Sequence, residues 1–335
     1  MTLTLSGEPG YTPARCVAVW AEMSEARDLC AFPCSLLGHQ TGDPARLRVG
    51  GRPAGRNRQA KALRREIFGG HGGQVLTDYV NEVWRLRHFW LALVRNDLRN
   101  RYRRSMIGLG WSLLQPISMT IIFCVVFSAL FQQEIRTFAP YLLSGLVFWG
   151  FVAGSVNQGC QCFFMGESYI RQHRAPLAIH ALRIVLGAGV HFLLGMGVVL
   201  VLVAVVGGLK NPVALLSLLP ALVLMLLLGW SLAVVLGVVN VLFQDTQHLV
   251  EVGLQMLFYL TPIMYPAELM RKRSLGWFID FNPLAALLEL IRSPLLSGQI
   301  PPPLAMGVAS VTVLALAVAA VLLLCWAERR IIMYL

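Results

Sequence analysis

Uninterrupted apolar stretches between Ser112 and Trp326 constrain this chain more than any other feature. Several of them reach about twenty residues, which is enough for a helix to cross roughly 30 Å of hydrocarbon. Charged residues make up only 13% of the 335, about half the roughly 25% that is usual in soluble domains. The sequence therefore excludes a soluble single-core protein, a disordered chain and a disulfide-linked secreted domain. It predicts an all-α polytopic membrane protein.

The apolar stretches divide into six expected transmembrane helices. In chain order these cover residues 112–131, 141–164, 184–209, 213–243, 249–265 and 304–326. Between the fifth and sixth spans, residues 266–297 contain only two short apolar pieces, which are separated by Asn282-Pro283. Because neither piece is long enough to span, this segment predicts a re-entrant or interfacial helical hairpin.

The part before the first span has two different characters. Residues 1–78 are rich in proline, glycine and arginine, show no persistent periodicity and contain no signal-peptide pattern, so we expect a disordered extension. Residues 79–105 combine helically spaced apolar residues, including Trp84 and Trp90, with many arginines. Such a pattern is typical of a helix lying in the membrane interface. The remainder divides into a transmembrane domain over 106–330 and a cytoplasmic tail over 331–335.

The net charge of +11 would suggest a nucleic-acid partner in a soluble protein. Here most of the surplus lies beside apolar spans, so we interpret it as topology and contact with membrane lipids, with no nucleic acid. Arginines before span one, and Arg171, Arg174 and Arg183 after span two, predict a cytoplasmic N-terminus. Arg329 and Arg330 predict a cytoplasmic C-terminus, although Arg271, Lys272, Arg273 and Arg292 before the last span argue against this orientation.

Catalytic and cofactor motifs are missing from the sequence. It has no G-x-x-x-x-G-K-[ST], H-E-x-x-H or G-x-S-x-G pattern, and the loose pair Cys30 and Cys34 lacks a second pair for a metal. Spans one, two, four and six contain no charged residue, and span three offers only His191, a packing histidine or a proton relay. We therefore expect no catalytic residue, metal or cofactor here, and an external energy source for any transport.

Three motifs, which follow one another along the chain, give it a resemblance to a known protein family. They are residues 101–116 (RYRRSMIGLGWSLLQP), residues 243–246 (FQDT) followed by 260–266 (LTPIMYP), and Asn282-Pro283-Leu284 with Arg292. Over residues 80–335 the chain resembles the ABC-2 type (type-2 ABC exporter) permeases. Within them it resembles the branch that exports lipid-linked polysaccharides such as O-antigen, capsule or teichoic acid. Gln244 departs from the arginine that this family often has before the aspartate, which puts a salt-bridge role there in doubt.

The resemblance implies a homodimer of six-span permeases in the bacterial inner membrane. Two copies of a separate ATPase subunit would bind ATP and Mg²⁺. It also implies a coupling segment that docks on the ATPase and comprises Glu167, Ser168, Tyr169, Ile170, Arg171 and Arg174. Arginines near the portal could bind the diphosphate of a polyprenyl-linked glycan, or only anchor the helix: Arg95, Arg99, Arg101, Arg103 and Arg104.

Aromatic residues suggest a path for the glycan. Four of them are the candidates: Trp149, Phe151, Tyr259 and Tyr265. The alternative is an ordinary interfacial aromatic belt. Two other functions also stay open, namely an ABC-2 permease for drugs or small lipids and a membrane glycosyltransferase that uses polyprenyl phosphate. The second would need acidic residues at the headgroup level, and the chain offers Asp245, Glu251, Asp280 and Glu289.

Overall fold

A computed structural model describes residues 72–103, 105–131, 134–172, 176–208, 211–266 and 282–334. All described residues belong to the compact unit that covers residues 63–335. Their regular structure is entirely helical, which confirms the all-α prediction. The expected disordered extension over 1–78 and the first apolar piece of the hairpin lie largely or wholly outside the described residues.

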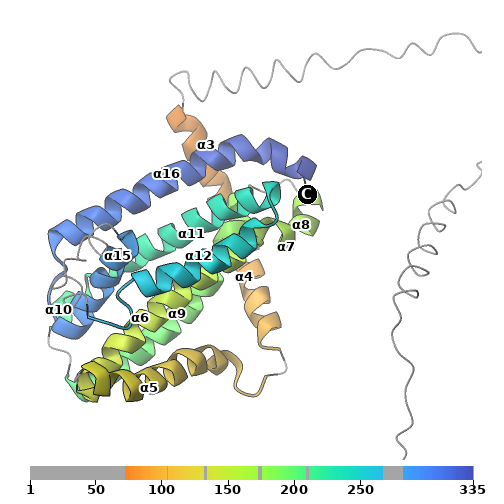
Figure 1. Cartoon of the computed structure of the whole chain (residues 1–335). Helices are drawn as coiled ribbons and strands as arrows, with labels where there is room; N and C mark the ends of the chain where they lie inside the picture. The colour runs from red at the N-terminus through yellow and green to blue at the C-terminus, as the bar shows by residue number, and fades with distance from the viewer. Residues whose placement is uncertain are drawn as a thin grey trace, which may run out of the picture. The chain divides into compact units, whose positions relative to one another are not determined.

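Five described helices are long and apolar enough to cross a membrane. They are α5 (Trp111–Phe131), α6 (Ile135–Cys160), α9 (Ala178–Val206), α11 (Leu218–Leu242) and α16 (Pro303–Tyr334). Figure 1 shows α6, α9, α11 and α16 as a bundle, from which α5 diverges. The chain is therefore a multi-pass membrane protein. The predicted fifth span corresponds to α12 (Thr246–Leu260), whose 15 residues make it too short to count among them.

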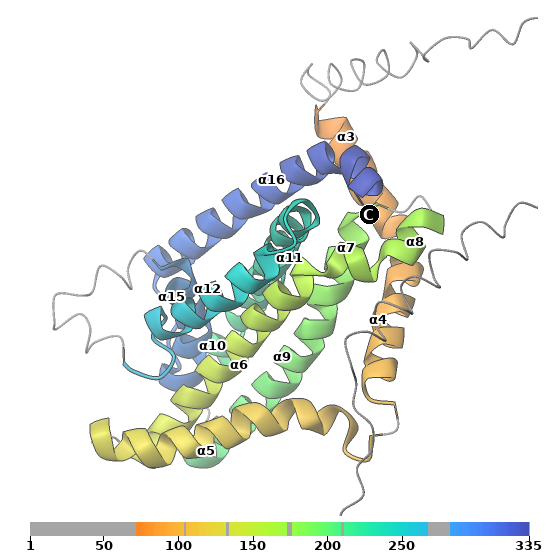
Figure 2. The ribbon, with the colours of Figure 1, turned by 45° about the vertical axis from the view of Figure 1, so that its right-hand side comes forward.

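Short helices connect and flank these spans (Figure 2). The expected single interfacial helix is two helices, α3 (Gly72–Arg85) and α4 (Arg87–Arg101), so regular structure begins before the predicted boundary at residue 78. After α6 come α7 (Cys162–Met165) and α8 (Glu167–Gln172), and α10 (Pro212–Leu215) precedes α11. Before α16 lie α15 (Pro283–Arg292) and the π-helical turn η3 (Ser293–Ser297), which include the second apolar piece of the hairpin.

Small residues let α6 and α11 approach closely. Gly229, Ala233 and Gly237 recur every four residues on α11, and a Cβ at Gly159 of α6 would lie 2.6 Å from the Cα of Ala233. Near this contact, Asn240 Nδ2 donates a hydrogen bond to Cys160 O at 2.8 Å. Close backbone approach and interhelical side-chain bonds are the usual means of helix association in lipid, where burial from water cannot drive it.

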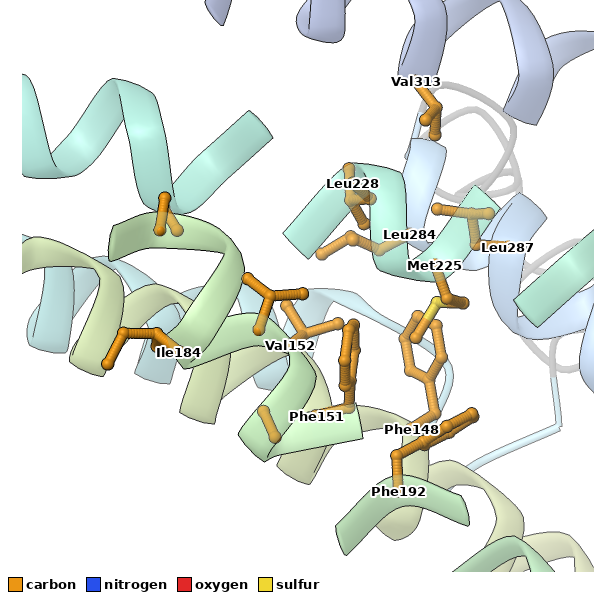
Figure 3. Packing of buried hydrophobic residues seen from close by; sticks show 14 of the residues in the cluster. Phe148, Phe151, Val152, Ile184, Phe192, Met225, Leu228, Leu284, Leu287 and Val313 are labelled. Atoms are coloured by element: carbon orange, nitrogen blue, oxygen red, sulfur yellow. The ribbon is translucent and has the colours of Figure 1, made fainter. Parts of the chain in front are cut away.

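Large side chains fill the centre of the bundle. Phe148 and Phe151 of α6 pack with Phe192 of α9 and Met225 of α11, as Figure 3 shows. Leu287 of α15 and Val313 of α16 belong to the same cluster. This packing places α6 at the core, with α9, α11 and α12 against it.

Candidate functional site

A cleft of about 690 Å³ lies between the end of α4, the first half of α5, and the facing parts of α6 and α9. One part of its lining is polar and comprises Arg101, Tyr102, Ser105, Ser112, Gln115, Gln158 and His191. The other part is largely aromatic and includes Trp111, Trp149, Phe151, Phe192 and Phe258. The cleft can therefore hold a molecule with both polar and apolar parts.

The turn between α4 and α5 shapes the polar part. Tyr102 caps the C-terminal end of α4, and its hydroxyl lies 3.3 Å from Nε2 of His191 on α9. Ser105 Oγ then accepts a hydrogen bond from Gly108 N at 3.0 Å, and Gly108 has the left-handed φ of 57° that glycine adopts without strain. This motif, residues 101–116, was predicted as a family signature, and the structure places most of its polar side chains in the cleft.

The aromatic part of the cleft also borders a second cavity. Trp149 lies 5.5 Å from Phe258 between ring centroids, and both residues also line a second hollow of about 290 Å³ between α6 and α12. Phe151 packs on Phe192 at 5.4 Å. Of the predicted glycan path, Trp149 and Phe151 line the cleft, whereas Tyr259 lines the hollow. Tyr265 lines neither cavity, because it lies in the turn after α12 and its hydroxyl donates to Tyr259 O at 3.0 Å.

The predicted portal arginines lie on α4 or just after it. Arg95, Arg99, Arg101 and Arg103 are exposed, and Arg104 lies outside the described residues. Of the four that the structure describes, Arg101 lines the cleft. The structure thus brings one of the four described arginines to the cleft, and the other three are exposed outside its lining.

The predicted coupling segment forms α8. Ile170 is buried in the main core cluster, and the ring of Tyr169 lies 6.3 Å from the ring of Phe89 on α4, edge to face. Glu167 begins the helix. The side chains of Ser168 and Arg171, and the whole of Arg174, lie outside the described part of the chain. The helix α8, which was predicted as the coupling segment, and α4, which was predicted as part of an interfacial helix, are therefore in contact, and the sequence did not predict this contact.

An ion pair between α4 and α9 was also missed. Arg183 was predicted in a loop, but it lies within α9 because that helix begins at Ala178 rather than at residue 184. Its Nε donates to Oδ2 of Asp97, and its Nη2 donates to Oδ1 at 3.0 Å. The available signal was Asp97 itself, an acidic residue among the arginines of an expected basic helix.

A second buried arginine fastens the turn after α12. The guanidinium of Arg292 donates to Pro262 O at 2.6 Å, Ile263 O at 2.9 Å and Tyr141 O at 3.0 Å, and lies 3.6 Å from the centre of the Tyr141 ring. Burial lowers the pKa of Arg292, whereas nearby Tyr141 and Glu289 raise it. This arginine, which was counted as a loop charge, is a buried structural residue.

The neighbouring motif residues complete this arrangement. Asn282 Oδ1 accepts from Leu284 N and so caps α15, while its Nδ2 donates to Thr261 Oγ1 at 3.1 Å. Tyr141 of α6 donates its hydroxyl to Tyr265 O at 2.8 Å. We call Tyr141, Arg292, Asn282 and the turn 261–265 the arginine knot. It joins the second and third sequence motifs, which are distant in the chain.

Residues 88–296 match the sequence pattern of a known family, the ABC-2 type transporters. The match covers 209 of 335 residues (296 − 88 + 1), including the α4–α5 turn of the cleft and the arginine knot. The chain belongs to the ABC-2 type transporter family. Membership in this family agrees with a transport role rather than an enzymatic one.

Curated relatives of this ABC-2 protein are named as O-antigen export or polysialic acid transport proteins. It is 25% identical over 211 residues to an O-antigen export system permease protein RfbA of Klebsiella pneumoniae, covering 63% of this chain and 81% of the relative. It is 27% identical over 240 residues to RfbA of Myxococcus xanthus, and the match covers 70% of this chain and 92% of the relative. It is 23% identical over 219 residues to the polysialic acid transport protein KpsM of Escherichia coli, and the match covers 62% of this chain and 81% of the relative.

Proposed function

We propose that this chain is the membrane-spanning subunit of an ATP-driven transporter that exports a lipid-linked polysaccharide. The observation that carries the proposal is the cleft, in which Arg101 and other polar groups face aromatic rings within an ABC-2 transporter. A polyprenyl-diphosphate glycan has an anionic head, an apolar tail and sugar rings, and the lining offers a partner for each. The names of the relatives support polysaccharide export.

The energy comes from a separate subunit in this proposal. The sequence has no phosphate-binding G-x-x-x-x-G-K-[ST] loop, so ATP and Mg²⁺ would bind to two copies of an ABC ATPase on a homodimer of this chain. The coupling segment would receive the ATPase movement. Its contact with α4 through Tyr169 and Phe89 offers a route from that movement to the cleft.

The proposed topology has six spans in the bacterial inner membrane. In it, α12 and the turn that follows form the fifth crossing, α15 belongs to the hairpin predicted over residues 266–297, and α3 and α4 lie in the interface. Both termini are cytoplasmic, which places α8 and the exposed arginines of α4 on the ATPase side. Those arginines would attract the diphosphate head, because a guanidinium matches phosphate oxygens with two parallel hydrogen bonds.

Cross-linking tests the coupling part of this proposal. In the complex with its ATPase, a cysteine-directed cross-linker should join a Tyr169→Cys variant to that subunit. A Val223→Cys variant, on an exposed position of the apolar α11, should not react with it. Absence of a cross-link from Tyr169→Cys during ATP turnover would contradict the assignment of α8.

A deletion experiment tests the function. Cells that lack this gene should accumulate the polysaccharide inside, where an added glycosidase reaches it only after permeabilisation. Reintroducing the gene should restore glycan at the surface. Unchanged surface glycan in the deletion strain would refute polysaccharide export, and altered drug sensitivity in its place would indicate a permease for small molecules.

A further inference from the structure

Polar and aromatic residues form a continuous stripe along two adjacent helices. On α12, Gln247, Glu251, Gln255 and Tyr259 follow one another at four-residue spacing; on α6 and the residue that caps its C-terminal end, the same spacing relates Trp149, Ala153, Asn157 and Gln161. Residues four apart lie on one face of a helix. The helices α6 and α12 lie side by side (Figure 1). The two series adjoin, because Gln161 and Gln247 share a hydrogen bond and other members line one hollow. We call them together the amide stripe.

Hydrogen bonds hold one end of the amide stripe together. Gln161 Nε2 donates to Gln247 Oε1 at 2.7 Å, and Gln247 Nε2 donates to Glu251 Oε1 at 3.3 Å. Asn157 is different, because its buried Oδ1 has no hydrogen-bond partner among the described residues. A buried amide oxygen without a partner costs free energy, so its persistence here requires an explanation.

The hollow of about 290 Å³ borders this residue, and a polar ligand in it would bring hydrogen-bonding groups close to the amide. Asn157 lines it together with Gln255, Tyr259, Trp149 and Phe258. Amide side chains both donate and accept hydrogen bonds, which suits the hydroxyl groups of a sugar. Flat aromatic rings beside them can stack on the C–H faces of a sugar ring. The lining therefore combines the two contacts that an uncharged carbohydrate needs.

Charge narrows the substrate class. The described residues that line the hollow carry no charge, and the charged member of the amide stripe is Glu251, which is acidic and exposed. Like charges repel more strongly in the low-dielectric surroundings of a membrane protein than in water. A polyanionic glycan would meet this carboxylate, whose recorded ion-pair partner is His248, with its Nδ1 3.9 Å from Oε2 of Glu251 and charged only when protonated.

We infer that the amide stripe is a binding site for the rings of an uncharged glycan and discriminates against polyanionic ones. The inference rests on the proposed function, because it names the substrate class of the exported polysaccharide. It assigns Asn157 and Gln255 to hydroxyl recognition, Trp149 to stacking and Glu251 to the rejection of acidic chains.

Fluorescence titration of the full-length chain in lipid nanodiscs tests the inference. The two probes are maltoheptaose, which is neutral, and heptagalacturonic acid, which has a similar length and is polyanionic. The Trp149 signal is taken as the difference between the wild type and Trp149→Phe. This difference separates the fluorescence change at the amide stripe from any change caused by polyanion binding at the exposed arginines of α4. We expect maltoheptaose to change the signal, with the polyanion binding about tenfold more weakly because of like-charge repulsion.

Variants test which side chains of the amide stripe contact the probes. Asn157→Leu and Gln255→Leu should each weaken maltoheptaose binding about fivefold, the effect of one lost hydrogen bond, and Glu251→Lys should bring the two probes to similar affinity. Gln244→Leu removes an exposed amide outside the stripe and should bind like the wild type. Gln255 is exposed, so its variant retains the fold.

Equal affinity for the two probes, or wild-type binding by Asn157→Leu and Gln255→Leu, would overturn the inference. The titration uses neither ATP nor an ATPase. A failure of ATP-driven export would therefore refute the proposed function separately, whatever the titration shows.

Discussion

The arginines of this protein occupy two contrasting environments. Arg183 and Arg292 are buried, and their guanidinium groups are directed at a carboxylate or at backbone carbonyls. Arg95, Arg99 and Arg101 of α4 are exposed. Buried cations persist only where hydrogen bonds and opposite charges compensate their desolvation, whereas exposed cations keep their hydration and can bind a ligand. The same residue type therefore serves the fold in one region and recognition in the other.

The largest effect is expected from removing the centre of the arginine knot. Arg292→Met should lower the free energy of unfolding by about 3 kcal/mol or more, because several buried carbonyls lose their donor. Thermal unfolding of the detergent-solubilised protein measures this loss. Arg99→Met, the matched change at an exposed site, should leave the transition almost unchanged. Equal stability of the two variants would end the distinction between the two environments.

Steric crowding of the same knot should have the next largest effect. A Cβ at Gly145 would lie 2.5 Å from Nη2 of Arg292, whereas a Cβ at Gly150 of the same helix would have no atom within 4 Å. Gly145→Ala should therefore destabilise the protein by about 1–3 kcal/mol, as overpacking usually does. Gly150→Ala serves as the control in the same unfolding measurement. If Gly145→Ala were as stable as Gly150→Ala, the knot would be looser than described.

The ion pair between α4 and α9 should contribute less, because the Asp97 side chain is 38% exposed. Asp97→Asn keeps one acceptor for Arg183 but removes the charge, so we expect a loss of about 1 kcal/mol after allowance for solvent screening. Faster hydrogen exchange of the backbone amides in α4 would report this loss of stability. Glu82→Gln makes the same change at an exposed position of α3 and should leave that exchange rate as it is. Identical exchange in both variants would mean that Asp97 does not hold the helix.

The smallest effect on stability is expected at the exposed arginines. Replacing Arg95, Arg99 and Arg101 with glutamine should change the free energy of unfolding by no more than about 0.5 kcal/mol per site. Binding of a polyprenyl diphosphate in nanodiscs should weaken markedly and lose its dependence on salt, because the guanidinium–phosphate contacts are gone. Unchanged binding with lowered stability would reverse the roles assigned to the two groups.

The sequence predicted the helical class and most spans well, because long apolar runs have few alternatives in a membrane. It predicted the α4–α5 turn as a motif but not its cleft, since that cleft requires α6 and α9 to lie beside it. Arg183 and Arg292 were misjudged for a related reason. Counting charges in loops ignores tertiary partners, and the partners of Arg292 are up to 151 residues away in the chain. The amide stripe also escaped notice, because its two halves belong to helices that are distant in sequence.

Reconstitution tests the central claim most directly. Proteoliposomes containing this chain, its ATPase and a polyprenyl-diphosphate glycan should move the glycan across the bilayer only when ATP and both proteins are present. A glycosidase on the receiving side measures the amount transported. Movement by this chain without the ATPase, or no movement by the complete complex with ATP, would contradict the account.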